Sequence, residues 1–460
     1  MVEKNNKKEA LLKTKARKYS IKEGIFSSSR ASFGDLYISP FAIAVNASNS
    51  MVSLLTSILG LLGPLGQISG SKFLEKFSRK QILRKTIFFE SLMWLPLILI
   101  AFLFYKGIVI EMLPLLILIT FAIYTILLNM GHPAWFSWMG EIVEEKHRGK
   151  YFSKRNLILG FVSVILAIIS AVFLDYFKKQ GGIMFGFMIL FLLAFITRLI
   201  ARKILKKQYE PKIKLKKTDH ISFWEFISNA PKTNFGKFTI FRSLIGFSAA
   251  IASPLIAVYL LRYIGFSYVD YMIITLGGTF VSLFILEFWG KFSDRYGNYR
   301  TMVLASIIIP LVPLLWILNT SIIYLLLIPS LASGIGWAGI HLAAGNFIYD
   351  NVPPQKRGLM VSYFNMVWGI GVALGAGVGA FLIKFLHSSF IEPLILIFII
   401  SAIARIIVAI WWLPKIKEVR ETKKFSIDKA LKHLIFKGAK LTLIEEAHEI
   451  MSIKRYIQTK

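Results

Sequence analysis

The chain has 460 residues, of which 55% are hydrophobic and none is cysteine, and its formal net charge is +30. Soluble domains contain about 45–50% apolar residues and seldom carry many long apolar runs, so this composition excludes an ordinary soluble protein. The lack of cysteine excludes disulfide bonds and thiolate metal sites. A net charge this large indicates nucleic-acid binding in a soluble protein, but the placement of the charges described below argues against a nucleic-acid partner.

The N-terminal segment, residues 1–23, is polar and basic. It has no apolar core followed by a small-residue cleavage site, as a signal peptide would have. We therefore predict that it is a basic cytoplasmic tail.

Twelve apolar segments follow, and each can supply, with its flanks, the roughly 20 residues that cross about 30 Å of hydrocarbon. We predict membrane spans near 24–47, 51–72, 82–105, 112–140, 153–175, 182–204, 236–261, 267–289, 301–319, 322–348, 358–385 and 391–413. The first and seventh spans are weakened by Arg30, Asp35 and Arg242. The expected fold class is an all-α membrane protein with twelve transmembrane helices.

A polar, Lys-rich stretch separates the first six spans from the last six. This division predicts an N-terminal six-helix bundle at 24–204, a cytoplasmic linker at 205–235, a C-terminal six-helix bundle at 236–413 and a cytoplasmic amphipathic tail at 414–460.

Lysine and arginine lie mainly on one side of the predicted membrane. With the N-terminus inside, the outer loops carry only Lys106, Lys178, Lys179, Arg262 and Lys384. This positive-inside pattern places both termini in the cytoplasm. We expect the inner basic loops to attract anionic lipid headgroups.

The two predicted bundles share an internal sequence repeat. A shift of 209 residues aligns His132 with His341, Arg148 with Arg357, and the acidic Glu141 with Asp350. Because each half has an even number of spans, both halves have the same orientation in the membrane. We therefore predict a parallel repeat related by a pseudo-two-fold axis along the membrane normal.

A charged loop, GKFSDRYGNYR at 290–300, returns in weaker form as SKFLEKFSRK at 71–80. The first resembles the loop signature G-x3-D-R/K-x-G-x-R/K-R/K of the major facilitator superfamily. The second departs from it, with Ser71, Glu75 and Ser78 in place of Gly, Asp and Gly. The resemblance, which covers about residues 24–413, implies a transporter fold with a central cavity lined by spans one, four, seven and ten.

In that family these loops hold the two halves together at the cytoplasmic side. The resemblance implies the same gating role for Glu75, Lys76, Asp294 and Arg295. Companions at the same membrane face are Glu141, Arg148, Glu287, Gly290, Asp350 and Arg357. The alternative is that all of these residues, here called the latch residues, are ordinary solvated loop charges.

Two histidines are the clearest candidates for the cavity. His132 and His341 each lie nine residues before an inner-end acid, or roughly 14 Å deep at 1.5 Å per residue. Asn129 and Phe136 share a helical face with His132, as does Trp337 with His341. These side chains can line a substrate cavity, and an imidazole can carry a coupling proton. They can equally be hydrogen-bonding residues between helices.

Asp35 lies near mid-depth in the first span, and both Asp35 and Arg242 are candidates for the substrate cavity or for coupling. The alternative is that the two form a purely structural ion pair. Arg30 is about 140° away from Asp35 on a continuous helix, so we expect no pair between Arg30 and Asp35 and a pair of Asp35 with Arg242 across the halves. Glu90 is a further candidate for a role in transport. Arg198 and Arg405 lie near inner ends, and we expect their side chains to extend to the membrane surface.

The sequence contains no ATP-binding loop, no metal-binding motif and no converging set of acid and base, so we predict no cofactor, no metal and no enzymatic activity. We expect a monomeric secondary transporter in the plasma membrane that moves a small solute by alternating access, with a proton as a candidate coupling ion. Few buried charges favour a neutral or amphiphilic solute. A non-transporting receptor or scaffold with the tail as its output is the alternative.

Overall fold

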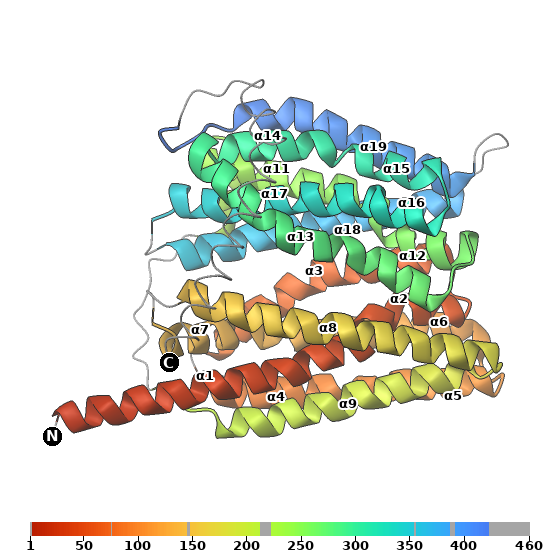
Figure 1. Cartoon of the computed structure of the whole chain (residues 1–460), viewed down its shortest axis with the longest axis horizontal. Coiled ribbons are helices and arrows are strands. Elements are labelled where there is room, and N and C mark those ends of the chain that lie inside the picture. Colours follow the sequence, from red (N-terminus) through yellow and green to blue (C-terminus); the bar gives the residue numbers. More distant parts are fainter. Residues whose placement is uncertain are drawn as a thin grey trace, which may run out of the picture.

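The computed structural model describes residues 2–74, 76–144, 148–211, 222–353, 356–386 and 392–422. The regular elements in these ranges are helices, and most run side by side along the long axis of the molecule (Figure 1). Eleven helical segments of the described part are long and apolar enough to cross a membrane. The chain is therefore a multi-pass, all-α membrane protein.

Residues 2–211, here called the N-terminal half, form the lower group of helices in Figure 1, and residues 222–422, the C-terminal half, form the upper group. The N-terminal half contains α1 (Val2–Phe33), η1 (Asp35–Tyr37), α2 (Ile38–Ala44), α3 (Asn49–Phe73), α4 (Arg79–Leu92), α5 (Trp94–Tyr105), η2 (Ile110–Met112), α6 (Leu113–Met130), α7 (His132–Ile142), α8 (Arg148–Lys179) and α9 (Ile183–Lys207). The C-terminal half contains α10 (Phe223–Asn229), α11 (Asn234–Ala250), η4 (Ser253–Leu255), α12 (Ile256–Val258), η5 (Tyr259–Tyr263), α13 (Tyr268–Tyr296), α14 (Asn298–Ile308), α15 (Leu311–Leu318), α16 (Ile322–Leu327), α17 (Pro329–Asn351), α18 (Arg357–Phe385), α19 (Pro393–Trp412) and η6 (Leu413–Lys415).

The eleven segments coincide with the second to twelfth predicted spans. The largest difference is at the end of α13, which continues to Tyr296 although the predicted span ends at 289. The helix does not stop where its apolar run stops, because Lys291 and Arg295 are good helix formers, and it ends before Gly297, whose φ is +95°.

The first predicted span, 24–47, is not among the eleven. Here α1 runs unbroken from Val2 through the predicted tail boundary to Phe33, and the chain then turns through η1 into α2. α1 carries too many polar side chains to qualify by composition, so the count of twelve spans stays a prediction. The amphipathic helix predicted in the tail lies outside the described residues, apart from 414–422.

Two local breaks position polar side chains inside the N-terminal half. α6 ends at Met130 and α7 begins at His132, because Pro133 has no N–H to donate to the preceding turn. α1 ends before Gly34, where the ring of Trp94 packs so closely that a Cβ atom would collide with it. The first break redirects the chain at His132, and the second redirects it at Asp35.

The two halves meet chiefly where α3 packs against α18 and α8 packs against α13. Small residues permit the first contact, since a Cβ built on Gly60 would lie 2.7 Å from the carbonyl oxygen of Gly369. α2 and η5, which lie at the end of the molecule opposite the N-terminus, also touch across the halves (Figure 1). We call the end that carries the N-terminus the near end and the opposite end the far end.

Candidate functional site

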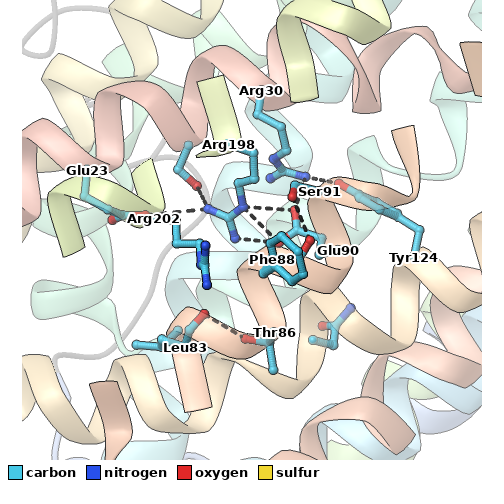
Figure 2. Close-up of polar contacts among 12 residues, drawn as sticks. Glu23, Arg30, Leu83, Thr86, Phe88, Glu90, Ser91, Tyr124, Arg198 and Arg202 are labelled. Atoms are coloured by element: carbon cyan, nitrogen blue, oxygen red, sulfur yellow. Dashed lines mark hydrogen bonds and ion pairs between the residues drawn. The ribbon is translucent and has the colours of Figure 1, made fainter. Parts of the chain in front are cut away.

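A network of buried charges crosses the N-terminal half (Figure 2). Arg198 of α9 lies 2.7 Å from Glu90 of α4 and 3.6 Å from Glu23 of α1. Arg30 of α1 lies 3.6 Å from the same Glu90, which is only 1% exposed. Figure 2 shows these side chains pointing toward one another from three helices.

Two further ion pairs complete the network. Arg155 of α8 lies 3.9 Å from Glu23, and Arg30 lies 2.8 Å from Asp35. The hydroxyl of Tyr124 donates to Asp35 at 2.5 Å and also contacts Arg30. Three carboxylates therefore face three guanidinium groups, and the network is balanced in charge. This balance matters because an unpaired charge away from water is costly.

The prediction that Arg30 and Asp35 do not pair is wrong. It assumed a continuous helix, whereas α1 ends at Phe33 and the 3₁₀ turn η1 brings Asp35 back toward Arg30. Arg242 therefore does not neutralise Asp35 across the halves, because Arg30 in the same half already does.

The prediction that Arg198 and Arg405 extend to the membrane surface is also wrong, since both are buried. Arg198 points inward to Glu90. Arg405 of α19 donates to the carbonyl oxygen of Ile309 at 2.9 Å, and to that of Ala249 at 3.5 Å. Each guanidinium finds acceptors inside its own half.

The C-terminal half holds a second cluster, made of Arg242 on α11, Trp337 and His341 on α17, and Trp368 on α18. Arg242 is 2% exposed, and its Nη2 lies 3.4 Å from Nδ1 of His341. Its guanidinium carbon lies 5.8 Å from the ring centre of Trp368. The ring of Trp337 stacks on His341 at 5.7 Å. We call these four residues the Arg242 cluster; it includes two of the histidine-site residues predicted from sequence.

The matching residues of the N-terminal half do not form such a cluster. His132 and Phe136 have exposed side chains on α7. Asn129 is buried, where it accepts a hydrogen bond from Gln67 at 3.2 Å and donates one to the carbonyl oxygen of Thr125. Asn129 therefore joins α3 to α6.

The latch residues at the near end take several positions. Asp350 lies 2.9 Å from Arg420 and accepts a hydrogen bond from Asn298 at 2.7 Å, whereas the exposed Asp294 lies 3.7 Å from Arg420. Glu287 pairs with Lys291 one turn later in α13, on the surface. Arg357 donates to backbone carbonyl oxygens of Tyr349 and Val352.

The remaining latch residues are less informative. The guanidinium of Arg295 lies over the ring of Tyr296. A Cβ added at Gly290 would meet nothing within 4 Å, and Lys76 and Glu141 are exposed. Glu75 lies outside the described residues, and so does the side chain of Arg148, whose backbone begins α8.

Sequence reasoning missed several members of these sites. Glu23, Arg155 and Tyr124 of the buried network carried no motif, and neither did Trp368. Arg420 and Glu418 lie in the segment predicted as a tail, yet Glu418 accepts a hydrogen bond at 2.8 Å from the backbone N–H of Tyr299 at the start of α14. The mixed charges of KEVRE at 417–421 were the available signal.

The hydrogen bonds that join the two halves, within the described part of the chain, lie at the far end and in the adjoining part of α3 and α18. Asp175 of α8 accepts from the backbone N–H groups of Tyr268 and Val269, which begin α13, at 2.8 and 2.9 Å. Arg262 donates to the carbonyl oxygen of Ala47 at 2.8 Å and to the side chain of Asn49.

Two serines of α3 add to these contacts between the halves. Ser53 donates to the carbonyl oxygen of Ala376 at 2.9 Å, and Ser57 donates to that of Ala373 at 2.8 Å. The described residues include no group of three or more histidine, cysteine, aspartate or glutamate side chains placed to hold a metal ion.

Solved structures of several transporters are similar to this fold, and two of them illustrate the likeness. The nucleoside transporter NupG is 15% identical, with a TM-score of 0.65 over 88% of this chain and 99% of its own. A bacterial homologue of the iron transporter ferroportin in an inward-facing state is 14% identical, with a TM-score of 0.67 over 87% of this chain and 99% of its own. At these identities the likeness establishes the fold alone.

Comparison of sequences gives the family. The chain is 30% identical over 99 residues to the uncharacterized MFS-type transporter YfiU of Bacillus subtilis (strain 168), a match that covers 22% of this chain and spans only 19% of that relative. The family model described as Major Facilitator Superfamily matches residues 25–284 and 238–451, which together cover most of the chain. The chain therefore belongs to the Major Facilitator Superfamily.

Proposed function

We propose that the protein is a secondary transporter that moves a small solute across the plasma membrane by alternating access, with both termini in the cytoplasm. Two six-helix bundles, related by a pseudo-two-fold axis along the membrane normal, would rock about a site between them. Membership of the family and the basic near-end loops support this proposal.

The observation that carries the proposal is the concentration of inter-half hydrogen bonds toward the far end. Asp175 neutralises the positive N-terminus of α13, and Arg262 closes on the turn between α2 and α3. Contacts of this kind are individually modest, about 0.3–2 kcal/mol each. A few of them can hold one end closed and still break during a transport cycle.

The contacts at the near end also support alternating access. Its ion pairs between described residues connect elements of one half, as Arg420 does with Asp350 and Arg79 does with Glu210. Hydrogen bonds join the halves at the far end, and at the near end no ion pair between two described residues crosses the halves. We therefore infer that this conformation is a state open to the cytoplasm. The latch residues would meet across the halves only in the opposite state.

A cross-linking experiment tests alternating access directly, because the chain has no native cysteine. Ser57→Cys with Gly377→Cys tests a disulfide between the halves, because a Cβ on Gly377 would lie 3.7 Å from the hydroxyl oxygen of Ser57. Ser32→Cys with Ser163→Cys tests one within the N-terminal half, where the two hydroxyl oxygens are 3.0 Å apart. Solute flux into proteoliposomes, measured with and without a pH gradient, is the readout.

Oxidation of the inter-half pair should abolish flux, and reduction should restore it, whereas the pair within one half should leave flux unchanged. Full cross-linking of the inter-half pair without loss of flux would contradict alternating access. Solute binding without flux in the unmodified protein would favour the receptor or scaffold alternative. A dependence of flux on the pH gradient would identify the proton as the coupling ion.

A further inference from the structure

We propose that Arg242, His341 and Trp368 form an oxyanion-binding subsite, and that the transported solute is therefore a small organic molecule with a carboxylate or phosphate group. This inference rests on the proposed function, because it names the substrate class of the same central site. It replaces the neutral or amphiphilic solute that the sequence favoured.

The first argument is that Arg242 is a buried cation without an anion. The side chain is 2% exposed, and its Nε and Nη1 have no hydrogen-bond partner among the described residues. Its remaining polar contact is the 3.4 Å approach to His341, which is long for a hydrogen bond. A buried guanidinium without an anionic partner is costly, and a bound anion would remove the cost.

The second argument is that the sequence around Arg242 offers no acid to fill this role. Between residues 236 and 413 the acidic residues are Asp270, Glu287, Asp294, Asp350 and Glu392. Asp270 and Glu392 lie at far-end helix starts, and the other three lie near the inner end of α13 or α17. No carboxylate lies in the interior of the C-terminal half at the level of Arg242.

The two halves differ at equivalent places in the sequence. Arg30 and Gly34 have the same spacing as Arg242 and Gly246. Arg30 is neutralised by Asp35 and lies close to Glu90. Arg242 has neither partner. Arg405, the other buried arginine of the C-terminal half, uses backbone carbonyl oxygens instead. Arg242 thus stands apart from every comparable arginine in the described interior.

The third argument is that a second unused donor lies beside the first. Nε1 of Trp368 is buried and has no hydrogen-bond acceptor among the described residues, and its ring lies next to the guanidinium. Arginine and indole N–H groups only donate, so the cluster supplies several donors and no obligate acceptor. A carboxylate or phosphate, whose oxygens accept only, matches this set, and a guanidinium can bind either in a bidentate manner.

His341 is exposed, so a solute can reach the subsite past its ring, and the ring offers the solute a further contact. Its ring is accessible on α17, stacks on Trp337 and reaches Arg242. A solute approaching past His341 would meet the guanidinium behind it. The oxyanion would then lie between Arg242 and Trp368, with the remainder of the solute directed toward the N-terminal half.

The test begins with thermal unfolding of the detergent-purified full-length protein in the presence of three groups of compounds. These are short mono- and dicarboxylates, inorganic phosphate with phosphate monoesters, and neutral sugars. We expect at least one carboxylate or phosphate compound to raise Tm and the sugars to have no effect. The group that acts distinguishes carboxylate from phosphate. Stabilisation by chloride equal to that by every oxyanion, or by sugars alone, would overturn the proposal.

Two substitutions then locate the effect. Arg242→Gln should weaken binding of the active compound by about tenfold or more, and Arg242→Lys by less, because loss of a charge-assisted hydrogen bond has an effect of this order. Trp368→Phe keeps the ring but removes the donor, so it should also weaken binding. Arg202→Gln is the matched control. Arg202 lies in the N-terminal half, where it donates to the carbonyl oxygen of Arg84, so this variant should bind the compound normally.

A misfolded variant would be recognised from the ligand-free protein. Removal of an unpaired buried cation should leave the Tm of Arg242→Gln unchanged or raised, whereas a large fall would mean that Arg242 has a structural partner, which would overturn the proposal. The subsite and transport can fail separately. Oxyanion binding that needs Arg242 without any flux would refute transport only, and flux of a neutral solute unaffected by Arg242→Gln would refute the subsite only.

Discussion

Arg198 of α9 donates hydrogen bonds to the carboxylate of Glu90 from two nitrogens, with Nε 2.8 Å and Nη2 2.7 Å from the same oxygen, Oε2. Glu90 is also within 3.6 Å of Arg30, so one carboxylate on α4 connects α1 and α9. Since Glu90 is fully enclosed, this pair fixes how three helices of the N-terminal half pack together.

Glu90→Gln should therefore strongly destabilise the protein. Removal of one partner from a buried ion pair typically costs about 3–5 kcal/mol, because the remaining charge is left uncompensated. Thermal unfolding of the purified protein measures the effect. Glu287→Gln is the matched control, since it removes a surface pair with Lys291 that contributes about 0–1 kcal/mol. Equal losses of Tm in the two variants would contradict the central role of Glu90.

Asp175→Asn should favour opening of the far end. The carboxylate of Asp175 caps the first turn of α13 from the opposite half, and loss of its charge weakens an interaction with the helix dipole of about 1 kcal/mol. That amount changes the ratio of two conformations by about fivefold. Labelling of Ser53→Cys, a position buried between the halves, by a membrane-impermeant maleimide should become faster.

Asp270→Asn is the control for this measurement. Asp270 caps the same helix start from within α13, through Ser267, so its loss weakens the helix end without affecting an inter-half contact. An increase in labelling as large as that of Asp175→Asn would mean that fraying of α13, and not separation of the halves, exposes position 53.

The two acids that meet Arg420 should differ in their contribution to stability. Asp350 is 2.9 Å from Arg420 and its side chain is 13% exposed, whereas Asp294 is 3.7 Å away and its side chain is 78% exposed. Water screens the second pair far more than the first. Asp350→Asn should therefore lower Tm clearly, and Asp294→Asn should hardly change it.

Arg420→Gln should reproduce the effect of Asp350→Asn, and the double variant should lose little more than either single variant, because both remove the same interaction. Additive losses would show that Asp350 acts mainly through its hydrogen bond with Asn298. Any effect of Asp294→Asn on flux without an effect on Tm would fit a gating role in the opposite conformation.

The sequence predicted the helical architecture well, because a membrane span needs a long apolar run and eleven such runs are present. The first span stays a prediction, because α1 is helical but too polar to be identified as a span by composition. Its polar residues find partners inside the bundle, as Glu23 and Arg30 do, so burial of this helix depends on residues of α4, α8 and α9 that no local pattern identifies.

The candidate site was predicted in part. Depth along each helix made His341 and Arg242 separate candidates for the cavity, but it did not predict the contact between them, because Arg242 was expected to pair with Asp35. Which charged side chains contact one another could not be predicted from depth along the helices. The contact of Arg30 with Asp35 depends on the end of α1 at Gly34, and the isolation of Arg242 depends on which side chains α17 and α18 bring to it. Both depend on tertiary packing.

Gly60→Ala should shift the protein away from the described conformation. A Cβ at this position would lie 2.7 Å from the carbonyl oxygen of Gly369 and 2.9 Å from the backbone nitrogen of Ala373, so α3 and α18 would have to separate. Backbone atoms cannot move aside as a flexible side chain can. We expect slower disulfide formation between Ser57→Cys and Gly377→Cys when Gly60→Ala is added.

Gly160→Ala is the matched control, because a Cβ at this position on α8 meets nothing within 4 Å. Alanine stabilises a helix interior by up to about 1 kcal/mol relative to glycine, so this variant should keep the wild-type cross-linking rate and should not lower Tm. The same change from glycine to alanine should slow cross-linking when it is made at position 60 but not when it is made at position 160. This difference separates the effect of steric contact from that of helix propensity. If Gly60→Ala cross-links as fast as Gly160→Ala, then α3 and α18 do not need their close approach to keep the far end closed.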